Sequence, residues 1–138
     1  MANERQIRIK EIIPRTYNVK SFRLKLDNRI DFKAGQFLAI TLKTEPKLEK
    51  YLSISSSPTE EGYIEFTKKI TESEFSKILT SLNPGDYVKI KYPFGQFTLK
   101  DEYTKVAFIA GGIGITPIRS ICKYVVDKKL NVDIVLLY

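Results

Sequence analysis

Lys50-Tyr51-Leu52-Ser53-Ile54-Ser55-Ser56-Ser57-Pro58 begins as a β-strand and ends in a run of hydroxyl side chains closed by a proline. Tyr51 to Ile54 have strand propensity, and the residues after them are turn formers. A cation, an apolar side chain and small hydroxyls therefore meet where a strand ends. This combination suits a ligand with an anionic tail and a flat polar ring. A strand that simply runs into a serine-rich turn explains the same residues.

Alternating apolar and polar residues on both sides of this stretch predict short strands separated by turns. A helix is expected at 73–82, where apolar residues recur at helical spacing and Ser73 or Thr71 can cap the start. Short strands at this spacing indicate a closed antiparallel barrel or a sandwich, with the helix plugging one end. The expected strands are residues 5–13, ended by Pro14, then 17–26, 37–42, 51–54, 63–69 and 87–92, with a polar connection at 44–49.

The pattern changes after about residue 100. Residues 105–110 and 132–138 are unbroken apolar runs, which is typical of parallel strands covered on both faces. A glycine-rich turn and a helix lie between them, so the segment predicts a βαβ unit. Two domains are expected, 1–100 and 101–138, with the boundary near 98–104. The helix should begin at Thr116-Pro117, with an apolar face formed by Ile118, Ile121, Val125 and Val126.

The glycine-rich turn reads Gly112-x-Gly114-x-x-Pro117. Glycines in such a turn let the backbone approach a pyrophosphate, and the helix that follows offers free N–H groups and the positive end of its dipole. A nucleotide site is one explanation. A tight turn that needs positive φ is the other, and the motif alone does not separate them.

Composition narrows the classes of function. The 138 residues are 43% hydrophobic and 28% charged, as in an ordinary globular protein, with a formal charge of +7. The lysines are scattered, so the charge indicates only a preference for anionic partners such as nucleic acid, membrane surfaces or phosphorylated ligands. One cysteine and no histidine exclude a disulfide framework, an imidazole-based triad and a zinc or iron–sulfur site built from this chain alone. Cys122 is expected to be a buried, small apolar residue.

The N-terminus leads directly into an alternating strand and lacks the apolar core of a signal peptide. No apolar run approaches the roughly 20 residues that span a bilayer. A cytoplasmic protein without a membrane span is therefore predicted.

Several motifs, in order, resemble the ferredoxin–NADP reductase superfamily, whose flavin domain is a six-stranded Greek-key barrel followed by a nicotinamide-nucleotide domain. The flavin signature Arg-x-Tyr-Ser corresponds to Lys50-Tyr51-Leu52-Ser53, and the lead-in Phe-x-Ala-Gly-Gln-Phe stands intact at 32–37. The phosphate motif Gly-x-x-Ser corresponds to 73–76. Pro-Gly-Asp and Pro-x-Gly-x-Phe stand at 84–86 and 93–97, and Ala-Gly-Gly-x-Gly-x-Thr-Pro at 110–117.

The resemblance implies a flavin-dependent oxidoreductase that passes electrons from NADH or NADPH, through FAD, to an unidentified small molecule or redox protein. The fold it implies is a six-stranded antiparallel Greek-key β barrel with one short helix, followed by a truncated α/β nucleotide-binding unit. No nucleic acid partner and no metal are expected. Because the cofactors carry the chemistry, a chain without histidine still suits this function.

The resemblance also implies site residues. Lys50 would neutralise the FAD pyrophosphate, Leu52 would cover the isoalloxazine ring, and Ser53, the candidate catalytic residue, would lie near the flavin N5 where hydride arrives. Tyr51 belongs to the same signature, although packing on the barrel is its favoured explanation. Ser76 would hold phosphate. The remaining candidates are Lys68, Lys69 and Ile70 under the ribityl chain, unless they form an ordinary edge strand, and Gly111, Gly112, Gly114 and Thr116 for the nicotinamide nucleotide.

Departures from the family pattern keep alternatives open. Lysine at position 50 replaces an arginine and loses the bidentate fork, leucine at 52 replaces a stacking aromatic, and serine at 73 replaces a glycine. The competing hypotheses are a non-catalytic barrel that binds anionic ligands or nucleic acid, and a family member that has lost its flavin. Since a nucleotide domain needs more than two strands, the chain is also expected to be incomplete at Tyr138.

Overall fold

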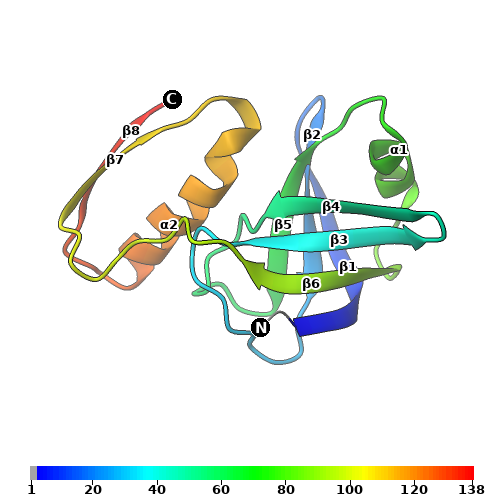
Figure 1. Cartoon of the computed structure of the whole chain (residues 1–138), viewed down its shortest axis with the longest axis horizontal. Coiled ribbons are helices and arrows are strands. Elements are labelled where there is room, and N and C mark those ends of the chain that lie inside the picture. The colour runs from blue at the N-terminus through cyan, green and yellow to red at the C-terminus, as the bar shows by residue number, and fades with distance from the viewer. Residues whose placement is uncertain (1–2) are drawn as a thin grey trace.

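An antiparallel barrel occupies the first part of the chain in the computed structural model, which describes residues 3–138 (Figure 1). Its six-stranded sheet has the order β4-β3-β6-β1-β2-β5, and a bridge between Ile54 and Phe66 joins the end of β4 to β5. The expected six-stranded barrel is therefore confirmed. The strands are β1 (Asn3–Thr16), β2 (Val19–Lys25), β3 (Phe37–Thr44), β4 (Lys47–Ser53), β5 (Tyr63–Lys69) and β6 (Tyr87–Phe94).

Strand β1 turns the corner of the barrel. Its first half, to Arg8, pairs with β6, and its second half, from Ile9, pairs with β2. Pro14 was expected to end the strand but lies within it. In this half the pairing partner is β2 and a register shift follows Pro14, so the missing N–H is tolerated.

The predicted polar connection at 44–49 is wrong. Strands β3 and β4 continue as a ladder to the pair Thr44–Lys47, and the turn shrinks to Glu45-Pro46. Thr44 and Lys47 are exposed and Glu49 accepts a hydrogen bond from Thr41, so the polarity of this segment does not oppose strand pairing.

Apolar side chains from alternating strand positions fill the barrel, and Phe22 and Phe66 stack at 5.1 Å between ring centroids. Helix α1 (Glu74–Ser81) adds the buried Phe75 and Leu79 to this core. The Ser73 hydroxyl accepts a hydrogen bond from the Ser76 amide, which confirms Ser73 as the N-cap.

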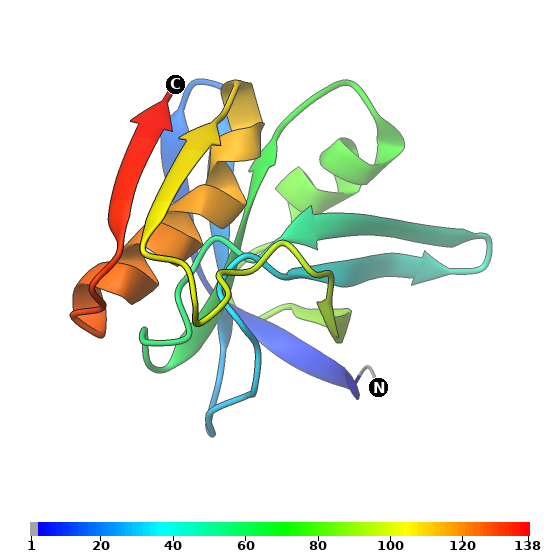
Figure 2. The same ribbon diagram turned by 60° about the vertical axis from the view of Figure 1, so that its left-hand side comes forward.

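The C-terminal segment forms the expected βαβ unit. Strands β7 (Lys105–Ile109) and β8 (Asp133–Leu137) are parallel, and helix α2 (Ile115–Asp127) follows a 3₁₀ turn at Gly112–Gly114. Helix α2 lies between the strand pair and the barrel (Figures 1 and 2). Its buried stripe is Ile118, Ile121 and Val125.

Two expectations about this helix are corrected. Val126 is 72% exposed, because it lies about 100° around the helix from Val125 and off the stripe that meets the barrel and the strands. Cys122 is only partly buried.

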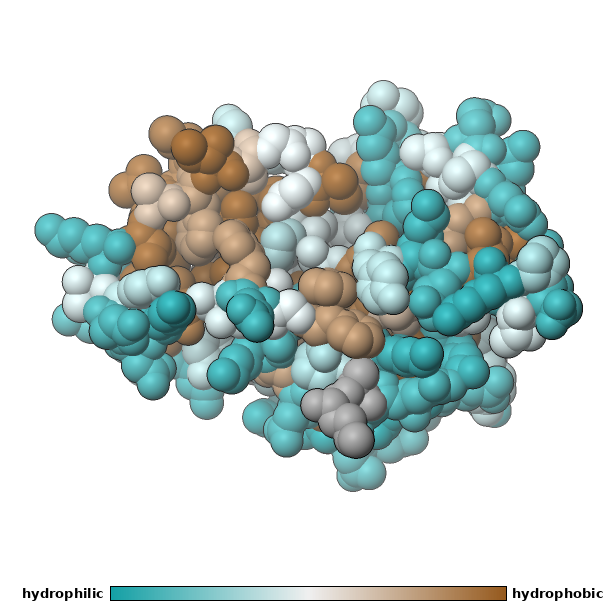
Figure 3. All heavy atoms as spheres, in the orientation of Figure 1, coloured by the Kyte–Doolittle hydropathy of each residue, from teal (hydrophilic) through white to brown (hydrophobic). Residues whose placement is uncertain are grey.

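The outer face of the β7–β8 pair is apolar and exposed. Ile109, Val135 and Leu137 are 82%, 58% and 59% exposed. Hydrophobic residues gather over β7 and β8 in the space-filling view (Figure 3). Among residues 3–138 only the inner face is packed, against α2, as expected of a single helix.

Candidate functional site

A cleft of about 570 Å³ separates the barrel from the glycine-rich turn. Its barrel wall comes from the β1–β2 hairpin (15–19) and from β5. Its other wall comes from the turn after β7, the first turn of α2 and the C-terminal Tyr138. Of the predicted site residues, the cleft brings together Lys69, Gly112 and Thr116.

Buried polar groups hold the barrel wall of this cleft in place. Glu65 is 3% exposed, accepts a hydrogen bond from Ser55 Oγ at 2.7 Å and pairs with Arg23 Nε at 2.9 Å. Arg15 Nη2 lies 3.4 Å from the same carboxylate. Ser55 Oγ also lies 2.9 Å from Thr67 Oγ1. Glu65 is therefore a paired, structural carboxylate rather than a free base.

The glycine-rich turn leaves open space around its backbone. Gly112 has a positive φ of 54°, which favours glycine, whereas Gly111 and Gly114 have ordinary backbone conformations. A Cβ built at any of these glycines would meet no atom within 4 Å in the described part of the chain. Positive φ thus explains why glycine occupies position 112 but not why it occupies positions 111 and 114. The open space around all three fits a ligand that approaches the backbone closely.

Thr116, two residues after Gly114, is buried and its hydroxyl donates to the Ile113 carbonyl at 3.2 Å. The first turn of α2 is thereby tied to the glycine turn. The free N–H groups of this helix start suit an anion.

A second group of predicted residues lies where β4 faces β5. Lys50 and Leu52 lie on the same face of β4, where they are the cross-strand partners of the buried Ile40 and Leu38 of β3. Leu52 also packs against the barrel core. Burial, together with the nearby charge of Lys50, lowers the pKa of Lys68. Lys68 on β5 is therefore within electrostatic range of Lys50 on β4, and such a pair of like charges suits an anionic group.

Tyr51 and Ser53 lie on the opposite face of β4. Tyr51 is 61% exposed and meets the rings of Phe37 and Phe94 edge-on, at 5.8 and 5.9 Å. This contact supports packing on the barrel as the explanation for Tyr51. Ser53 is half-buried opposite Phe37, and Ile70 packs partly against the core.

Ser76 is fully buried and its polar groups are already engaged. Its amide donates to Ser73 Oγ at 3.2 Å, and its hydroxyl accepts from the Thr71 amide at 3.0 Å. Phosphate binding at this helix start would have to displace the Ser73 cap.

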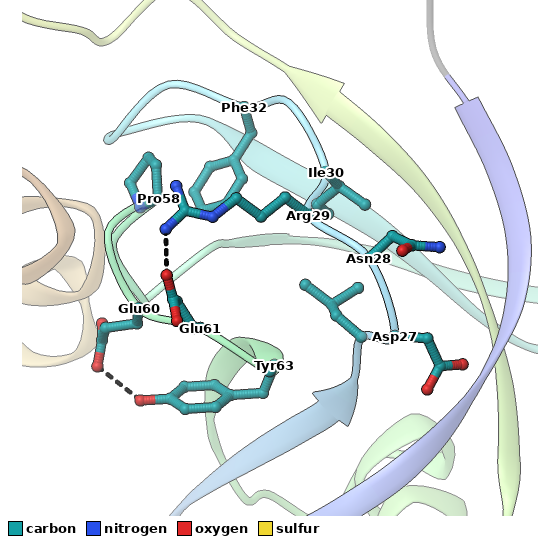
Figure 4. Close-up of a pocket in the computed structure, with 11 residues that line it drawn as sticks. Asp27, Asn28, Arg29, Ile30, Phe32, Pro58, Glu60, Glu61 and Tyr63 are labelled. Atoms are coloured by element: carbon teal, nitrogen blue, oxygen red, sulfur yellow. Dashed lines mark hydrogen bonds and ion pairs between the residues drawn. The ribbon is translucent and has the colours of Figure 1, made fainter.

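A further pocket of about 450 Å³ lies between the loop after β2 and the turn before β5 (Figure 4). Arg29 and Glu61 pair across its mouth, and the Tyr63 hydroxyl donates to Glu60 at 2.7 Å. Burial and this hydrogen bond raise the pKa of Tyr63 to about 12. Four of the polar side chains there are thus paired with one another, and the lining contains none of the predicted site residues.

Sequence reasoning missed much of the cleft wall. Glu65 carried one signal, a charge between the strand residues Ile64 and Phe66, which marks it as facing away from the core. Nothing in the local sequence connects it to Arg15 or Arg23. Arg119 lines the cleft from α2, and its Nη1 donates to the Ser55 carbonyl at 3.0 Å.

Comparison with known proteins identifies the family. Residues 6–99 match the model of the oxidoreductase FAD-binding domain, which is more than half of the chain. The chain belongs to this family. The open glycine turn and the facing lysines are thus features of a chain whose barrel is an FAD-binding domain.

Relatives extend over nearly all of the chain. The FAD-binding domain and the βαβ unit are together 34% identical, over 96% of the chain, to the glycine betaine monooxygenase reductase subunit of Pseudomonas aeruginosa. The chain spans only 38% of that protein. Ferredoxin–NADP⁺ reductase from Plasmodium falciparum is 25% identical with a TM-score of 0.74, over 88% of this chain and 52% of that one.

Phthalate dioxygenase reductase, described as a modular structure for electron transfer from pyridine nucleotides to [2Fe-2S], has the same fold. It is 20% identical with a TM-score of 0.83, over 97% of this chain and 43% of that one. The resemblance to the ferredoxin–NADP reductase superfamily is confirmed, as are FAD and NAD(P) as the cofactors of the family. Within residues 3–138, no helix combines the length and the apolarity that crossing a bilayer requires.

Proposed function

We propose that this chain forms the flavin-binding part and the start of the nucleotide-binding part of an FAD-dependent reductase that oxidises NADH or NADPH. The observation that carries the proposal is the cleft, where an open glycine turn faces β5 of an FAD-binding barrel. We also propose the division into residues 1–100 and 101–138, which is supported by the change from the barrel to the βαβ unit.

The residues present fit the flavin. We propose that Lys50 and Lys68 neutralise its pyrophosphate and that Leu52 covers the ring, because the Lys50 charge acts on Lys68 and Leu52 lies on the same face of β4 as Lys50. Lys69, which lines the cleft, and Ser53, at the end of β4, would lie beside the ring. Tyr51, Ile70 and Ser76 are proposed as neighbours that shape this site, since their side chains pack against other residues.

The residues present also fit a nicotinamide nucleotide. Gly111, Gly112 and Gly114 leave their backbone accessible to a pyrophosphate at the start of α2. Thr116 holds that turn in place and would lie next to the nicotinamide.

When bound, the flavin accepts a hydride from the nicotinamide and passes the two electrons on, singly or as a pair. The protein contributes binding, orientation and exclusion of water. Glu65, the buried carboxylate of the cleft, is already paired with arginines and is not free to act as an acid or base. The proposal requires neither, because the cofactors carry the chemistry.

The acceptor is proposed to be a redox protein or a small molecule. The names of the relatives, a monooxygenase reductase subunit and a reductase that delivers electrons to [2Fe-2S], favour a redox protein. A cytoplasmic location stays a prediction from the N-terminal sequence.

Reduction of bound flavin tests this function. The purified protein is saturated with FAD, freed of excess cofactor and mixed anaerobically with NADH or NADPH. We expect a visible flavin spectrum, which one of the nucleotides bleaches only slowly because two strands form only part of a nucleotide-binding site. A colourless protein that takes up no FAD would contradict the proposal and favour a barrel that binds other anions.

A further inference from the structure

Helix α2 is fastened to the serine-rich turn that follows β4. Ser120 Oγ, fully buried, donates to the Ser56 carbonyl at 2.7 Å. Thr59 Oγ1 donates to Asp127 at 2.5 Å. Ser55 and Ser56 therefore contact the nucleotide-binding unit through their backbone carbonyls, while their hydroxyls are hydrogen-bonded within the barrel.

Arg119 makes the most extensive of these contacts. Its Nη1 lies 3.0 Å from the Ser55 carbonyl and 2.5 Å from Glu60 Oε2, and its Nη2 lies 3.2 Å from Glu60 Oε1. Both guanidinium nitrogens thus engage one carboxylate while one of them also reaches the backbone of the turn. This is the planar, bidentate geometry that only arginine provides.

Glu60 is itself held from the barrel side. The Ser57 amide donates to its Oε2 at 2.7 Å, and the Tyr63 hydroxyl donates to its Oε1 at 2.7 Å. Its side chain is 11% exposed. The carboxylate is therefore a fixed anchor on the barrel rather than a mobile surface group.

The position of Arg119 in the chain gives this contact its significance. Thr116, in the glycine-turn wall of the cleft, lies three residues earlier on the same helix, so both are within one helical turn. On the barrel side, Ser55 follows Ser53 by two residues and hydrogen-bonds to Glu65, which lies in the barrel wall of the cleft. One side chain thus spans the two walls of the proposed cofactor site.

We infer that Arg119 is a positioning residue that, by gripping Glu60 and the Ser55 carbonyl, sets the separation and angle between the glycine turn and the flavin-facing strands. This inference rests on the proposed function. Hydride transfer requires the donor and acceptor atoms to lie almost in contact, and a displacement of about 1 Å can reduce the rate about 100-fold. Loosening this contact should therefore affect hydride transfer more than the binding of either cofactor.

The kinetic test compares variants of the FAD-loaded protein. Arg119→Ala removes the contact, Arg119→Lys keeps the charge without the fork, and Lys128→Ala is a matched control that removes a positive charge from the end of α2. Stopped-flow reduction of the flavin by the preferred nucleotide separates the limiting rate from the nucleotide dissociation constant. We expect Arg119→Ala to lower the limiting rate at least about tenfold, Arg119→Lys to recover it in part, and FAD affinity to change less than about twofold.

A distance measurement tests the same inference without cofactor or activity. Spin labels are placed on the exposed positions Lys25 of β2 and Val126 of α2, by substitution to cysteine in a Cys122→Ser background. Double electron–electron resonance should give one narrow distribution of label-to-label distances in the parent protein and in Lys128→Ala. In Arg119→Ala the distribution should broaden or shift.

The outcomes separate this inference from the proposed function. If the parent protein binds no flavin but Arg119→Ala still broadens the distance distribution, the proposed function is contradicted while the structural role of Arg119 stands. If the parent protein is reduced by the nucleotide and Arg119→Ala matches Lys128→Ala in both rate and distance, the positioning role is overturned. A loss of thermal stability alone, with the limiting rate unchanged below the melting transition, would also overturn it.

Discussion

Lys68 on β5 lies close enough to Lys50 on β4 for their positive charges to repel, and burial together with that repulsion lowers the pKa of Lys68. The fold brings two like charges together at the point where β4 and β5 meet. Such repulsion is relieved when an anion binds between the charges. The two lysines therefore support a phosphate site. Lys50 is the one that belongs to the flavin signature.

Substitution of Lys50 should weaken flavin binding. We expect Lys50→Ala to reduce the free energy of FAD binding by about 1.5–3 kcal/mol, the range for a charge-assisted hydrogen bond. Lys47→Ala, on the same strand and beside Glu49, is the control. Titration followed by flavin fluorescence measures both, and an unchanged dissociation constant for Lys50→Ala would remove this lysine from the site.

An aromatic ring at position 52 should improve flavin binding. Leu52 covers part of the barrel core and presents no π-system. We expect Leu52→Tyr to tighten FAD binding by about 0.5–1.5 kcal/mol and to quench flavin fluorescence, because the new ring can stack on the flavin. If neither the affinity nor the emission changes, residue 52 lies away from the ring.

The glycines should divide into structural and ligand-facing classes. Gly35 has a φ of 102°, and a Cβ there would lie 1.9 Å from the Phe97 carbonyl oxygen, so Gly35→Ala should strongly destabilise the fold. Gly114→Ala should raise stability slightly, by about 0.4–1 kcal/mol, because its backbone is helical and its surroundings are open. We nevertheless expect Gly114→Ala to weaken nucleotide binding.

Thermal unfolding and nucleotide titration check this division. A stable Gly114→Ala variant with unchanged affinity for NADH and NADPH would show that the turn does not approach the nucleotide.

Glu60 should make the protein sensitive to acid. Burial alone would raise its pKa, but hydrogen bonds from Arg119, the Ser57 amide and Tyr63 lower the pKa from 4.5 to about 2. A carboxylate with a lowered pKa stabilises the folded state above about pH 4.5 and loses that contribution as the pH falls towards about 2. Because Arg119 is partly exposed, solvent screening reduces the contribution.

We expect Glu60→Gln to lower the free energy of unfolding by about 1–2 kcal/mol at pH 7 and to have little effect near pH 2. Urea unfolding at a series of pH values measures the difference. Parallel stability curves for the two proteins between pH 5 and pH 2 would contradict it.

The exposed face of the β7–β8 pair should promote self-association. Ile109, Val135 and Leu137 form an apolar surface beside an unpaired strand edge in the described residues. We expect the 138-residue chain to associate as its concentration rises and Val135→Lys to reduce this. Light scattering after size-exclusion chromatography gives the molar mass. Identical monomeric behaviour of both proteins at high concentration would refute the expectation.

Local sequence patterns determined most of the secondary structure. The alternation in 63–69 correctly predicted β5, and the helical spacing after Ser73 correctly predicted α1 with Ser73 as its cap. The two apolar runs near the C-terminus form the predicted parallel pair. These elements are encoded by neighbouring residues, because side-chain period and turn chemistry act over a few positions. The order of motifs also identified the family, since it depends on the linear sequence alone.

Only the tertiary structure decided which of these residues meet. Closure of the barrel brings Ser55 within hydrogen-bond distance of Glu65. Packing of α2 lets Arg119 and Ser120 donate hydrogen bonds to the Ser55 and Ser56 carbonyls. No local pattern encodes the contacts between α2 and the serine turn, because they join positions 64 residues apart. They depend on strand register and on the face that α2 presents, which also left Val126 exposed. The cofactor motifs were therefore readable in the sequence, whereas the contact that holds the two cofactor walls together appeared only when the chain was folded.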